Sequence, residues 1–517
     1  AHVGYYLIDQ GMPALERAAG VVLTHRERLR RATERHALLA YLGAIVVLTV
    51  LVASALLVQV ASDGLRVGAW LALAALVMLA ASQPAVALVN WLATLRVMPR
   101  PLPRMDLSEG IPAHLRTLVV VPTMLTGASN VESLVEALEV RFLANRDACL
   151  HFGLLTDFVD ADQETTPEDG ALLALAGQYI DELNLKYGSQ AAFFLFHRPR
   201  HWNAAERTWM GHERKRGKLA DLNSLLRGGG GGFSRIVGDT AVLAGVKYVI
   251  TLDTDTELPR DAARKFVGAM AHPLNRPRFD HDHRRVTEGY GILQPRVAIS
   301  LPGTHRSRYA RLYGGEPGID PYTRVISDVY QDVFGEGSFI GKGIYDVDAF
   351  EQAVGGRFPE NRILSHDLLE GCYARAGLLS DEQLYEDSPA RYSADVSRRH
   401  RWIRGDWQLA AWLGRRVPGP DGQRQVNTLS LLSQWKLFDN LRRSLVPAAL
   451  TLLLLFGWTG LAPPGPWTLS LLGLLVIPAL GAALLDLVRW PDEVLARQHL
   501  ATVAGACADF FRIRAGQ

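Results

Sequence analysis

Cysteine is scarce in this sequence, and so is any excess of charge of one sign. The three cysteines, Cys149, Cys372 and Cys507, lie far apart in a chain of 517 residues. Their spacing fits neither a metal site nor a disulfide framework, which predicts free thiols in a reducing compartment. The 55 Lys and Arg residues nearly balance the 53 Asp and Glu residues, leaving a formal net charge of +2. We therefore expect no nucleic acid among its partners.

The sequence also lacks an initiator methionine and a signal-peptide pattern at its start. We expect residues 1–36 to form a cytoplasmic, helical N-terminal segment. Residues 490–517, with Phe510, Phe511 and two arginines near the end, predict an interfacial segment that is truncated. From both ends we expect a piece of a larger protein.

Long hydrophobic runs are present, but they are confined to two regions. They cover residues 37–60, 67–95, 444–461 and 467–485. Any one of them could be a buried core helix. Four runs in two pairs, flanking a mostly polar middle, favour membrane spans. We predict transmembrane hairpins over residues 37–96 and 444–489.

Arginines near the ends of these runs predict an orientation. Those at the outer ends of the hairpins are Arg26, Arg28, Arg30, Arg31, Arg35, Arg96, Arg100, Arg104, Arg442, Arg443, Arg489 and Arg497. The loops inside the hairpins carry only Arg66. Since Lys and Arg gather on the cytoplasmic side, both hairpins should start and end in the cytoplasm. The segment between them, residues 97–443, should lie there too.

The middle segment alternates short β-branched runs with helical periodicity. Strands are predicted at residues 117–121, 150–156, 191–196 and 246–252, and helices at 131–144, 171–185, 219–226 and 260–271. This rhythm predicts an α/β domain with a parallel sheet. Five consecutive glycines at residues 228–232 favour a surface loop over a phosphate loop, because no strand–turn–helix context surrounds them.

An aspartate pair follows the fourth predicted strand, in the segment LDTDTELP at residues 252–259. Asp253 and Asp255 stand at the carboxyl end of the strand, where ligands bind in open α/β sheets. Mg²⁺ and Mn²⁺ take carboxylate oxygens together with phosphate oxygens of a substrate. The pair predicts a divalent cation that holds a diphosphate, although aspartate pairs also occur in ordinary exposed turns.

Further residues near predicted strand ends and helix starts are candidates for binding a nucleotide-sugar. Pro122 and Thr123 end the first predicted strand, where a base or ribose could lie, or form a plain turn. Asp157 follows the second strand. Lys215 and Lys218 precede a predicted helix and can offset the charge of a diphosphate, or are simply solvated.

Two segments near the end of the polar middle suggest acceptor chemistry. Asp367 opens a predicted helix in SHDLLEG, residues 365–371. A carboxylate there could take a proton from a sugar hydroxyl if burial or a like charge raised its pKa. The alternative is a helix N-cap. The segment RRHRWIRGDW, residues 398–407, offers Arg for phosphate and Trp for a sugar face, but its composition also suits an interfacial helix.

Taken together, these motifs resemble the glycosyltransferase family 84 domain of bacterial cyclic β-1,2-glucan synthases. More broadly they resemble the family 2-like processive glycosyltransferases. The matching stretches are GYYLIDQGMPALE (4–16), LDTDTELP, GILQPRV (291–297), GEGSFIGKGIYDVDAF (335–350) and LSHDLLEG. The resemblance spans nearly the whole chain. It implies an α/β fold of GT-A (Rossmann-like) type inserted between two pairs of transmembrane helices of a bacterial inner membrane, with the catalytic domain in the cytoplasm.

The resemblance also implies an activity: inverting transfer of glucose from UDP-glucose to a growing β-1,2-glucan, with Mg²⁺ or Mn²⁺. Asp253 and Asp255 match the metal motif, with Asp255 counted among the catalytic residues. Asp367 matches the catalytic base of the T-E-D element, written S-H-D here. Arg398, Arg401 and Trp402 match Q-x-x-R-W, with Arg in place of Gln.

In the resembling family the glucan is held on a tyrosine. Tyr322 in GIDPYTRVISDVYQ is the first candidate and Tyr330 the second. Full-length members carry a phosphorylase-like region that this sequence lacks, so we expect that missing domain and the lipid bilayer as partners. Two alternatives stay open: another processive synthase, making cellulose or hyaluronan, and a non-catalytic sensor of nucleotide-sugars.

Overall fold

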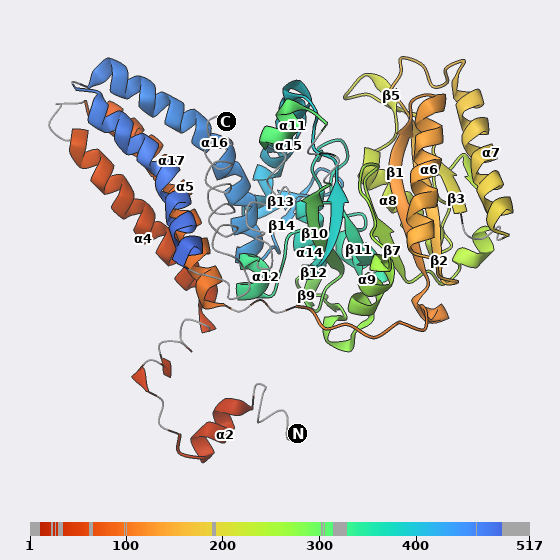
Figure 1. Cartoon of the computed structure of the whole chain (residues 1–517), viewed down its shortest axis with the longest axis horizontal. Helices are drawn as coiled ribbons and strands as arrows, with labels where there is room; N and C mark the ends of the chain where they lie inside the picture. The colour runs from red at the N-terminus through yellow and green to blue at the C-terminus, as the bar shows by residue number, and fades with distance from the viewer. Residues whose placement is uncertain are drawn as a thin grey trace.

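A bundle of long helices stands beside an α/β domain in the computed structural model of the chain (Figure 1). The structure describes residues 11–488, except residues 22–23, 26, 29–30, 32–34, 61–65, 98, 100, 189–192, 301–302, 304–305, 314–327 and 462. The predicted interfacial segment at 490–517 lies outside the described residues. So do Tyr322 and Cys507.

An eight-stranded mixed sheet forms the centre of the α/β domain, in the order β12-β10-β11-β7-β1-β2-β3-β6. The strands are β1 Thr117–Leu125, β2 Leu150–Phe158, β3 Phe193–His197, β6 Arg235–Val237, β7 Tyr248–Thr251, β10 Ile292–Ile299, β11 Gly343–Asp346 and β12 Ala376–Glu386. The four predicted strands form its parallel part, β7-β1-β2-β3. The expectation of a parallel sheet is therefore correct for this half and wrong for the whole, because β11 and β6 run antiparallel to their neighbours.

Strand β1 continues through Pro122, where the sequence predicted its end. Pro122 pairs with Leu155 of β2. On the other side, β7 pairs with β1 only from Thr117 to Val120. At Pro122 the strand thus has a single strand neighbour, which is where a residue without an N–H is tolerated.

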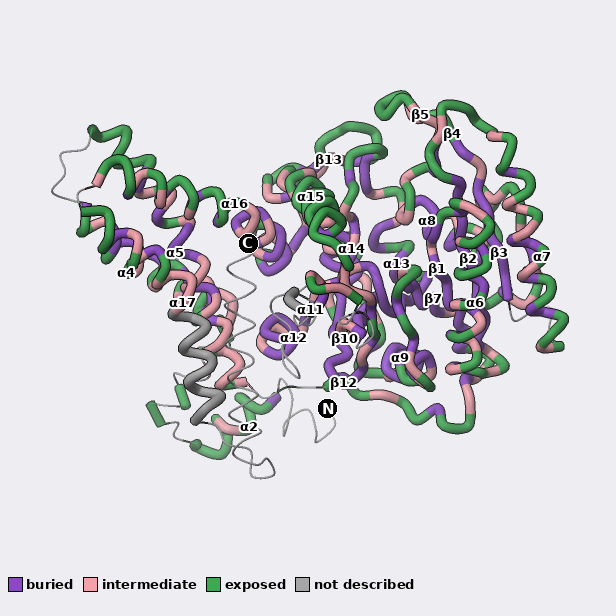
Figure 2. The backbone as a smooth tube through the Cα atoms, turned by 45° about the horizontal axis from the view of Figure 1, so that its top comes forward, coloured by how far each residue is buried: buried purple, intermediate pink, exposed green. Residues whose placement is uncertain are grey.

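Helices cover both faces of the sheet. One core contains side chains of α6 Ala128–Ala144, α7 Asp169–Tyr187 and α9 Ala262–Ala271. The other contains side chains of α8 Arg214–Leu226, α13 Val347–Val354 and α14 Asp367–Ala374. Every residue of β2 is buried, as expected for a strand covered on both faces, and the central strands form the buried centre of the domain (Figure 2).

Short elements complete the described chain. They are α2 Met12–Ala18, η1 Val58–Val60, η2 Ala113–Leu115, β4 His201–Asn203, β5 Thr208–Met210, η3 Thr240–Leu243, η4 Pro273–Asn275, β8 Arg278–Asp280, β9 Arg285–Glu288, α11 Arg308–Tyr313, α12 Val329–Phe334, η5 Leu409–Leu413, β13 Arg416–Pro418 and β14 Arg424–Val426. A longer helix, α15 Tyr392–Gln408, precedes η5.

The bundle consists of α4 Ala37–Leu57, α5 Val67–Arg96, α16 Leu431–Gly460 and α17 Gly465–Val488. Three segments are long and apolar enough to cross a membrane: Ala37–Val60 with 24 residues, and Val67–Arg96 and Leu431–Gly460 with 30 each. The fourth predicted span falls on α17, and the part of α17 that was searched, Gly465–Val476, is apolar but shorter. The structure thus supports three of the four predicted spans, and the second pair is not shown.

Helix α16 belongs to both parts of the molecule. It begins at Leu431, before the hydrophobic run that predicted a span, and its first turns pack on the α/β domain. Lys436 Nζ donates to Glu336 Oε1 at 2.9 Å and to the Gly337 carbonyl at 2.7 Å. Further along, Arg442 Nη1 donates to Ser82 Oγ of α5 at 2.9 Å. One helix therefore joins the sheet domain to the bundle.

Candidate active site

The predicted aspartate pair follows β7, which lies between β11 and β1 in the sheet. The Asp253 carboxylate contacts two lysines, with Lys215 Nζ 2.7 Å from Oδ1 and Lys342 Nζ 3.2 Å from Oδ2. Burial by itself would raise the pKa of Asp253, but the two lysines outweigh it and hold that pKa at about 2. Asp253 is therefore a carboxylate at neutral pH.

Glu386, at the end of β12, joins the pair to make a group of three carboxylates. One oxygen each of Asp253, Asp255 and Glu386 lies within 4.8 Å of the others. Burial, helped by the negative charge of Asp253, raises the pKa of Asp255 against the opposing charge of Lys342. Three converging carboxylate oxygens are a donor set that fits Mg²⁺ or Mn²⁺.

Sequence reasoning missed Glu386 and the buried Lys342 that pairs with it. Lys342 forms an ion pair with Glu386 as well as with Asp253, and its side chain is 4% exposed. Burial lowers the pKa of Lys342, yet the two carboxylates outweigh burial and raise it. Glu386 stands on a strand that was not predicted, so no local signal placed it at the site. Lys342 lies in the stretch GEGSFIGKGIYDVDAF, which matches the resembling family but gave no prediction for the lysine itself.

Lys215 lies between the aspartate pair and the predicted base. Its Nζ also donates to the Gly341 carbonyl at 2.8 Å. Gly341 has a φ of +89°, and a Cβ there would lie 2.7 Å from Asp367 Oδ1. Only a glycine allows this close approach. The structure therefore brings Asp253, Lys215 and Asp367 to one place.

Lys215 and Lys218 were predicted to precede a helix, and this is wrong. Helix α8 begins at Arg214, so both lysines lie within its first two turns. Gly217 concealed the helix in the sequence because glycine is a poor helix former. The structure shows why it is there: a Cβ on Gly217 would lie 2.1 Å from the His212 carbonyl oxygen.

Asp157, Lys218 and Thr123 form a second, more deeply buried group at the ends of β1 and β2. Arg198 Nε donates to Asp157 Oδ1 at 2.9 Å and Arg198 Nη2 to Oδ2 at 3.1 Å. Lys218 Nζ lies 3.1 Å from Asp157 Oδ2 and donates to the Thr123 carbonyl. Burial lowers the pKa of Lys218 despite the nearby Asp157. Arg198 was not predicted, and Pro122 is half-buried beside the group.

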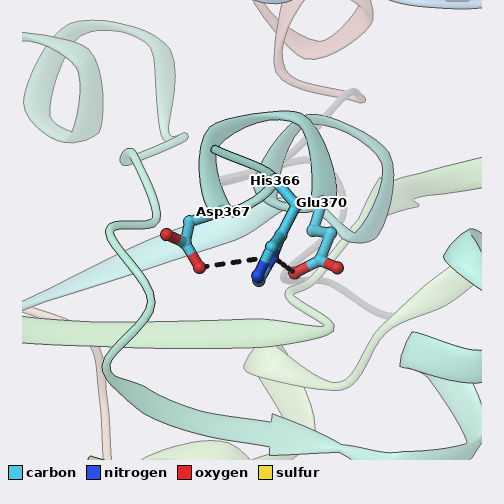
Figure 3. Close-up of side chains that lie close together, drawn as sticks. All are labelled: His366, Asp367 and Glu370. Carbon is cyan, nitrogen blue, oxygen red and sulfur yellow. Dashed lines mark ion pairs between the residues drawn. The ribbon is translucent and has the colours of Figure 1, made fainter. Parts of the chain in front are cut away.

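Asp367 is the first residue of α14, as predicted. The N-cap position is occupied by His366, and no side chain caps the helix, so the alternative role of Asp367 as an N-cap is wrong. The Asp367 side chain is 27% exposed, and its Oδ1 lies 3.4 Å from His366 Nδ1. His366 Nδ1 is also 3.0 Å from Oε2 of the buried Glu370 (Figure 3).

Helix α15 carries the Arg- and Trp-rich segment and packs directly against the residues before Asp367. A Cβ on Gly405 would lie 2.4 Å from Ser365 Cβ, and Gln408 Oε1 accepts the Leu364 N–H at 2.8 Å. One turn before Gly405, Trp402 is half-buried. The structure thus places the Trp402 helix beside the predicted base.

The two predicted arginines of α15 differ in their surroundings. The Arg398 guanidinium stacks over the Trp402 ring at 4.7 Å and donates to Asp395 at 3.1 Å. Arg401 is exposed, and its side chain makes no ion pair within the described part of the chain. Neither arginine contacts the aspartate pair through any described ion pair.

Tyr330 lies in α12 against the helix bundle, away from solvent. Its side chain is buried, and its hydroxyl accepts a hydrogen bond from Trp435 Nε1 at 3.2 Å. Attachment of a glucan to this hydroxyl would require it to leave that contact. Tyr322, the first candidate, falls outside the described residues.

Comparison with known proteins gives one match of high similarity. The chain is 42% identical over 508 residues to the cyclic beta-(1,2)-glucan synthase NdvB of Rhizobium meliloti (strain 1021). The resemblance predicted from the motifs is confirmed. No family model matches the chain. The aligned region is 97% of this chain but 18% of NdvB, so the likeness concerns one part of a much larger protein.

Proposed function

We propose that this chain is a membrane-embedded, inverting glucosyltransferase that passes glucose from UDP-glucose to a growing β-1,2-glucan. The observation that carries the proposal is the meeting of Asp253, Asp255 and Glu386 with Lys215, which in turn lies beside Asp367. Similarity to a cyclic β-1,2-glucan synthase over nearly the whole chain supports the choice of sugar and linkage. We assign the α/β domain to the GT-A type on the same grounds.

The donor would bind at the carboxyl ends of β1, β2 and β7. Asp253, Asp255 and Glu386 would hold Mg²⁺ or Mn²⁺, and the cation would neutralise the diphosphate as it leaves. Lys215 and Lys342 keep Asp253 ionised for this role. The group formed by Asp157, Lys218 and Thr123, with Pro122 beside it, lies where the base and ribose would rest.

Asp367 would act as the general base toward the acceptor. It would take the proton of the 2-hydroxyl while that oxygen attacks C1 and the bond from C1 to the diphosphate oxygen breaks. Attack from the opposite face inverts the anomeric centre. Such base assistance contributes roughly 10²–10⁴-fold to the rate. Trp402 would stack on the acceptor sugar, and Arg401 and Arg398 would donate hydrogen bonds to the diphosphate.

The three apolar helices would hold this domain on the cytoplasmic side of a bacterial inner membrane. The arginine distribution supports this orientation for the hairpin 37–96 and for residues 97–443. The second hairpin, residues 444–489, remains a prediction, as do the segments 1–36 and 490–517. Glucan attachment to Tyr322 or Tyr330 and a phosphorylase-like partner domain are proposals that rest on the family likeness.

The test is UDP release and product analysis in membranes that contain this chain, supplied with UDP-glucose and Mn²⁺. We expect β-1,2-linked glucan, and loss of at least 100-fold in turnover for Asp255→Asn and for Asp367→Asn. Glu386→Gln should raise the Mn²⁺ concentration needed for half-maximal activity, because it removes one of the three carboxylate ligands. The exposed Asp282, changed to Asn, is the matched control and should keep full activity.

Each alternative predicts a different result in this assay. A β-1,4-linked product would indicate a cellulose-type synthase. Incorporation of a second sugar, when its UDP form is supplied together with UDP-glucose, would indicate a hyaluronan-type one. Tight binding of UDP-glucose without UDP release would indicate a sensor. Near-normal turnover of Asp255→Asn would contradict the metal assignment.

A further inference from the structure

The residue between Ser365 and Asp367 is a histidine, and its surroundings are unlike those of an ordinary buried histidine. His366 is 6% exposed, and its Nδ1 faces two carboxylates of the same helix, Glu370 at 3.0 Å and Asp367 at 3.4 Å (Figure 3). Glu370 is 3% exposed, whereas Asp367 opens toward the site. The histidine thus connects a buried carboxylate to the proposed base.

The contacts within this trio are electrostatic. His366 Nδ1, Asp367 Oδ1 and Glu370 Oε2 are all buried atoms that have no hydrogen bond of standard geometry in the described part of the chain. A carboxylate as buried as Glu370 is stable only beside a positive charge or as the neutral acid. The His366 imidazole, 3.0 Å away, is the group in this trio that can supply that positive charge.

Charged groups on neighbouring elements affect the pKa of His366 less than burial and Glu370 do. From α8, the Lys215 ammonium opposes protonation of His366. From β11, the Tyr345 phenol interacts with Glu370 and stays neutral, because burial raises its pKa. From α15, Gly405 and Gln408 contact the adjacent backbone and carry no charge. Burial lowers the pKa of His366, but Glu370 and then Asp367 outweigh it, and the net pKa is raised.

We propose that His366 is a positioning residue for Asp367: held by the buried Glu370, its imidazolium holds the Asp367 carboxylate in place beside the acceptor. This rests on the proposed function, in which Asp367 is the base. The chain departs here from the T-E-D element of the family that it resembles, because a histidine occupies the middle position. The consequence is that the acid limit of glucosyl transfer is set by His366 and Glu370 as well as by Asp367.

The experiment is the pH profile of kcat for UDP release from about pH 3 to about pH 8, a range that contains the acid limb of a carboxylate whose ordinary pKa is about 3.9. His366→Gln removes the positive charge, so the acid limb should move upward by about one pH unit or more, since an opposite charge at this distance shifts a carboxyl by that amount. Glu370→Gln removes the group that holds the charge on His366 and should shift the limb in the same direction. His366→Lys keeps a positive charge and should bring the limb back toward the wild-type position.

The matched control is His114→Gln, at an exposed histidine of η2, which should reproduce the wild-type profile. A purely structural role would lower kcat equally at every pH without moving the limb, and that result overturns the inference. The inference is also overturned if the acid limb of the pH profile stays at the wild-type position in both His366→Gln and Glu370→Gln. If His366→Gln fails to fold, as judged by loss of UDP binding, the Glu370→Gln profile decides.

Failure of the inference and failure of the proposed function give different results. If Asp367→Asn is inactive and the acid limb of His366→Gln does not move, the role of His366 is rejected. The assignment of Asp367 as the base is then unaffected. An active Asp367→Asn rejects both, because His366 then has no base to position.

Discussion

Buried charges near the strand ends are paired with defined partners, and the structure depends on both members of each pair. Arg200 and Asp169 form such a pair behind the site. Arg200 Nη2 donates to Asp169 Oδ1 at 3.0 Å, and Arg200 Nε donates to the Val159 carbonyl at 2.6 Å. The loop that follows β2 and Asp157 is held in place by these bonds.

We expect Asp169→Asn to destabilise the chain by about 3–5 kcal/mol at neutral pH, because a buried guanidinium loses its counter-charge. Burial raises the pKa of Asp169, but hydrogen bonds from Arg200 and Thr166 outweigh it and lower the pKa. The carboxylate therefore stabilises the fold above its unfolded pKa of about 3.9, and this contribution is lost as the pH falls through the folded pKa. Thermal unfolding in detergent should show a gap between wild type and variant that narrows below about pH 4.

The control for that measurement is Asp181→Asn, at an exposed position of α7. It should leave the unfolding temperature unchanged at every pH. An equal loss in both variants, or a gap that does not narrow in acid, would contradict the pairing argument.

Site residues at the end of a predicted strand or the start of a predicted helix could be found from the sequence. Site residues on elements that were not predicted could not. Asp253, Asp255 and Asp367 follow local patterns, a strand end and a helix start. Glu386 and Lys342 reach the same place through the order of strands in the sheet, which no local pattern encodes. Their contacts could be found only once β12, β10, β11 and β7 were seen side by side.

At the scale of elements, α15 is positioned by the absence of a side chain. Gly405 lets the helix approach Ser365 so closely that even a methyl group would not fit without movement. That contact sets the distance between the Trp402 helix and the segment that carries Asp367. The glycine thus sets how far the proposed acceptor contact, Trp402, lies from the proposed base.

We expect Gly405→Ala to displace α15 and to lower kcat at least tenfold while UDP binding persists. The physical reason is that overpacking costs about 1–3 kcal/mol, and small misplacements of binding groups cost catalysis heavily. The measurements are kcat for glucan synthesis and the dissociation constant of UDP. Gly170→Ala in α7 is the control, since nothing lies within 4 Å of the added methyl, and it should be active and at least as stable. Unchanged kcat in Gly405→Ala would show that the contact is not limiting.

Elements whose apolar residues recur at a regular helical or strand spacing were predicted. Elements that also contain residues unfavourable to that structure were not. Helices 131–144, 171–185 and 260–271 correspond to α6, α7 and α9 within a few residues. Strand β10 contains Pro295, which discourages a strand in the sequence, yet it pairs with β11 and β12. A register shift between Pro295 and Arg296 accommodates it, and such irregularities depend on the neighbouring strand rather than on local sequence.

At the scale of the whole molecule, the arginine pattern predicts which side of the membrane each loop faces. We expect Arg66→Cys, introduced into a chain with its own cysteines changed to serine, to react with an impermeant maleimide in intact cells. His201→Cys, at an exposed position of β4, should react only after the membrane is permeabilised. Both follow from the enrichment of Lys and Arg in cytoplasmic segments. The reverse pattern of labelling would overturn the orientation, and labelling of both in intact cells would argue against a sealed bundle.

Because α16 runs from the α/β domain into the helix bundle, we expect the proposed site to respond to the lipid around the bundle. A bilayer thinner or thicker than the span changes the tilt of a transmembrane helix. In this chain the first turns of the same helix are held by hydrogen bonds from Lys436 to Glu336 and Gly337, in the stretch that leads to Gly341 and Lys342. We therefore expect acyl-chain length to alter the rate of the proposed glucosyl transfer through the tilt of this helix.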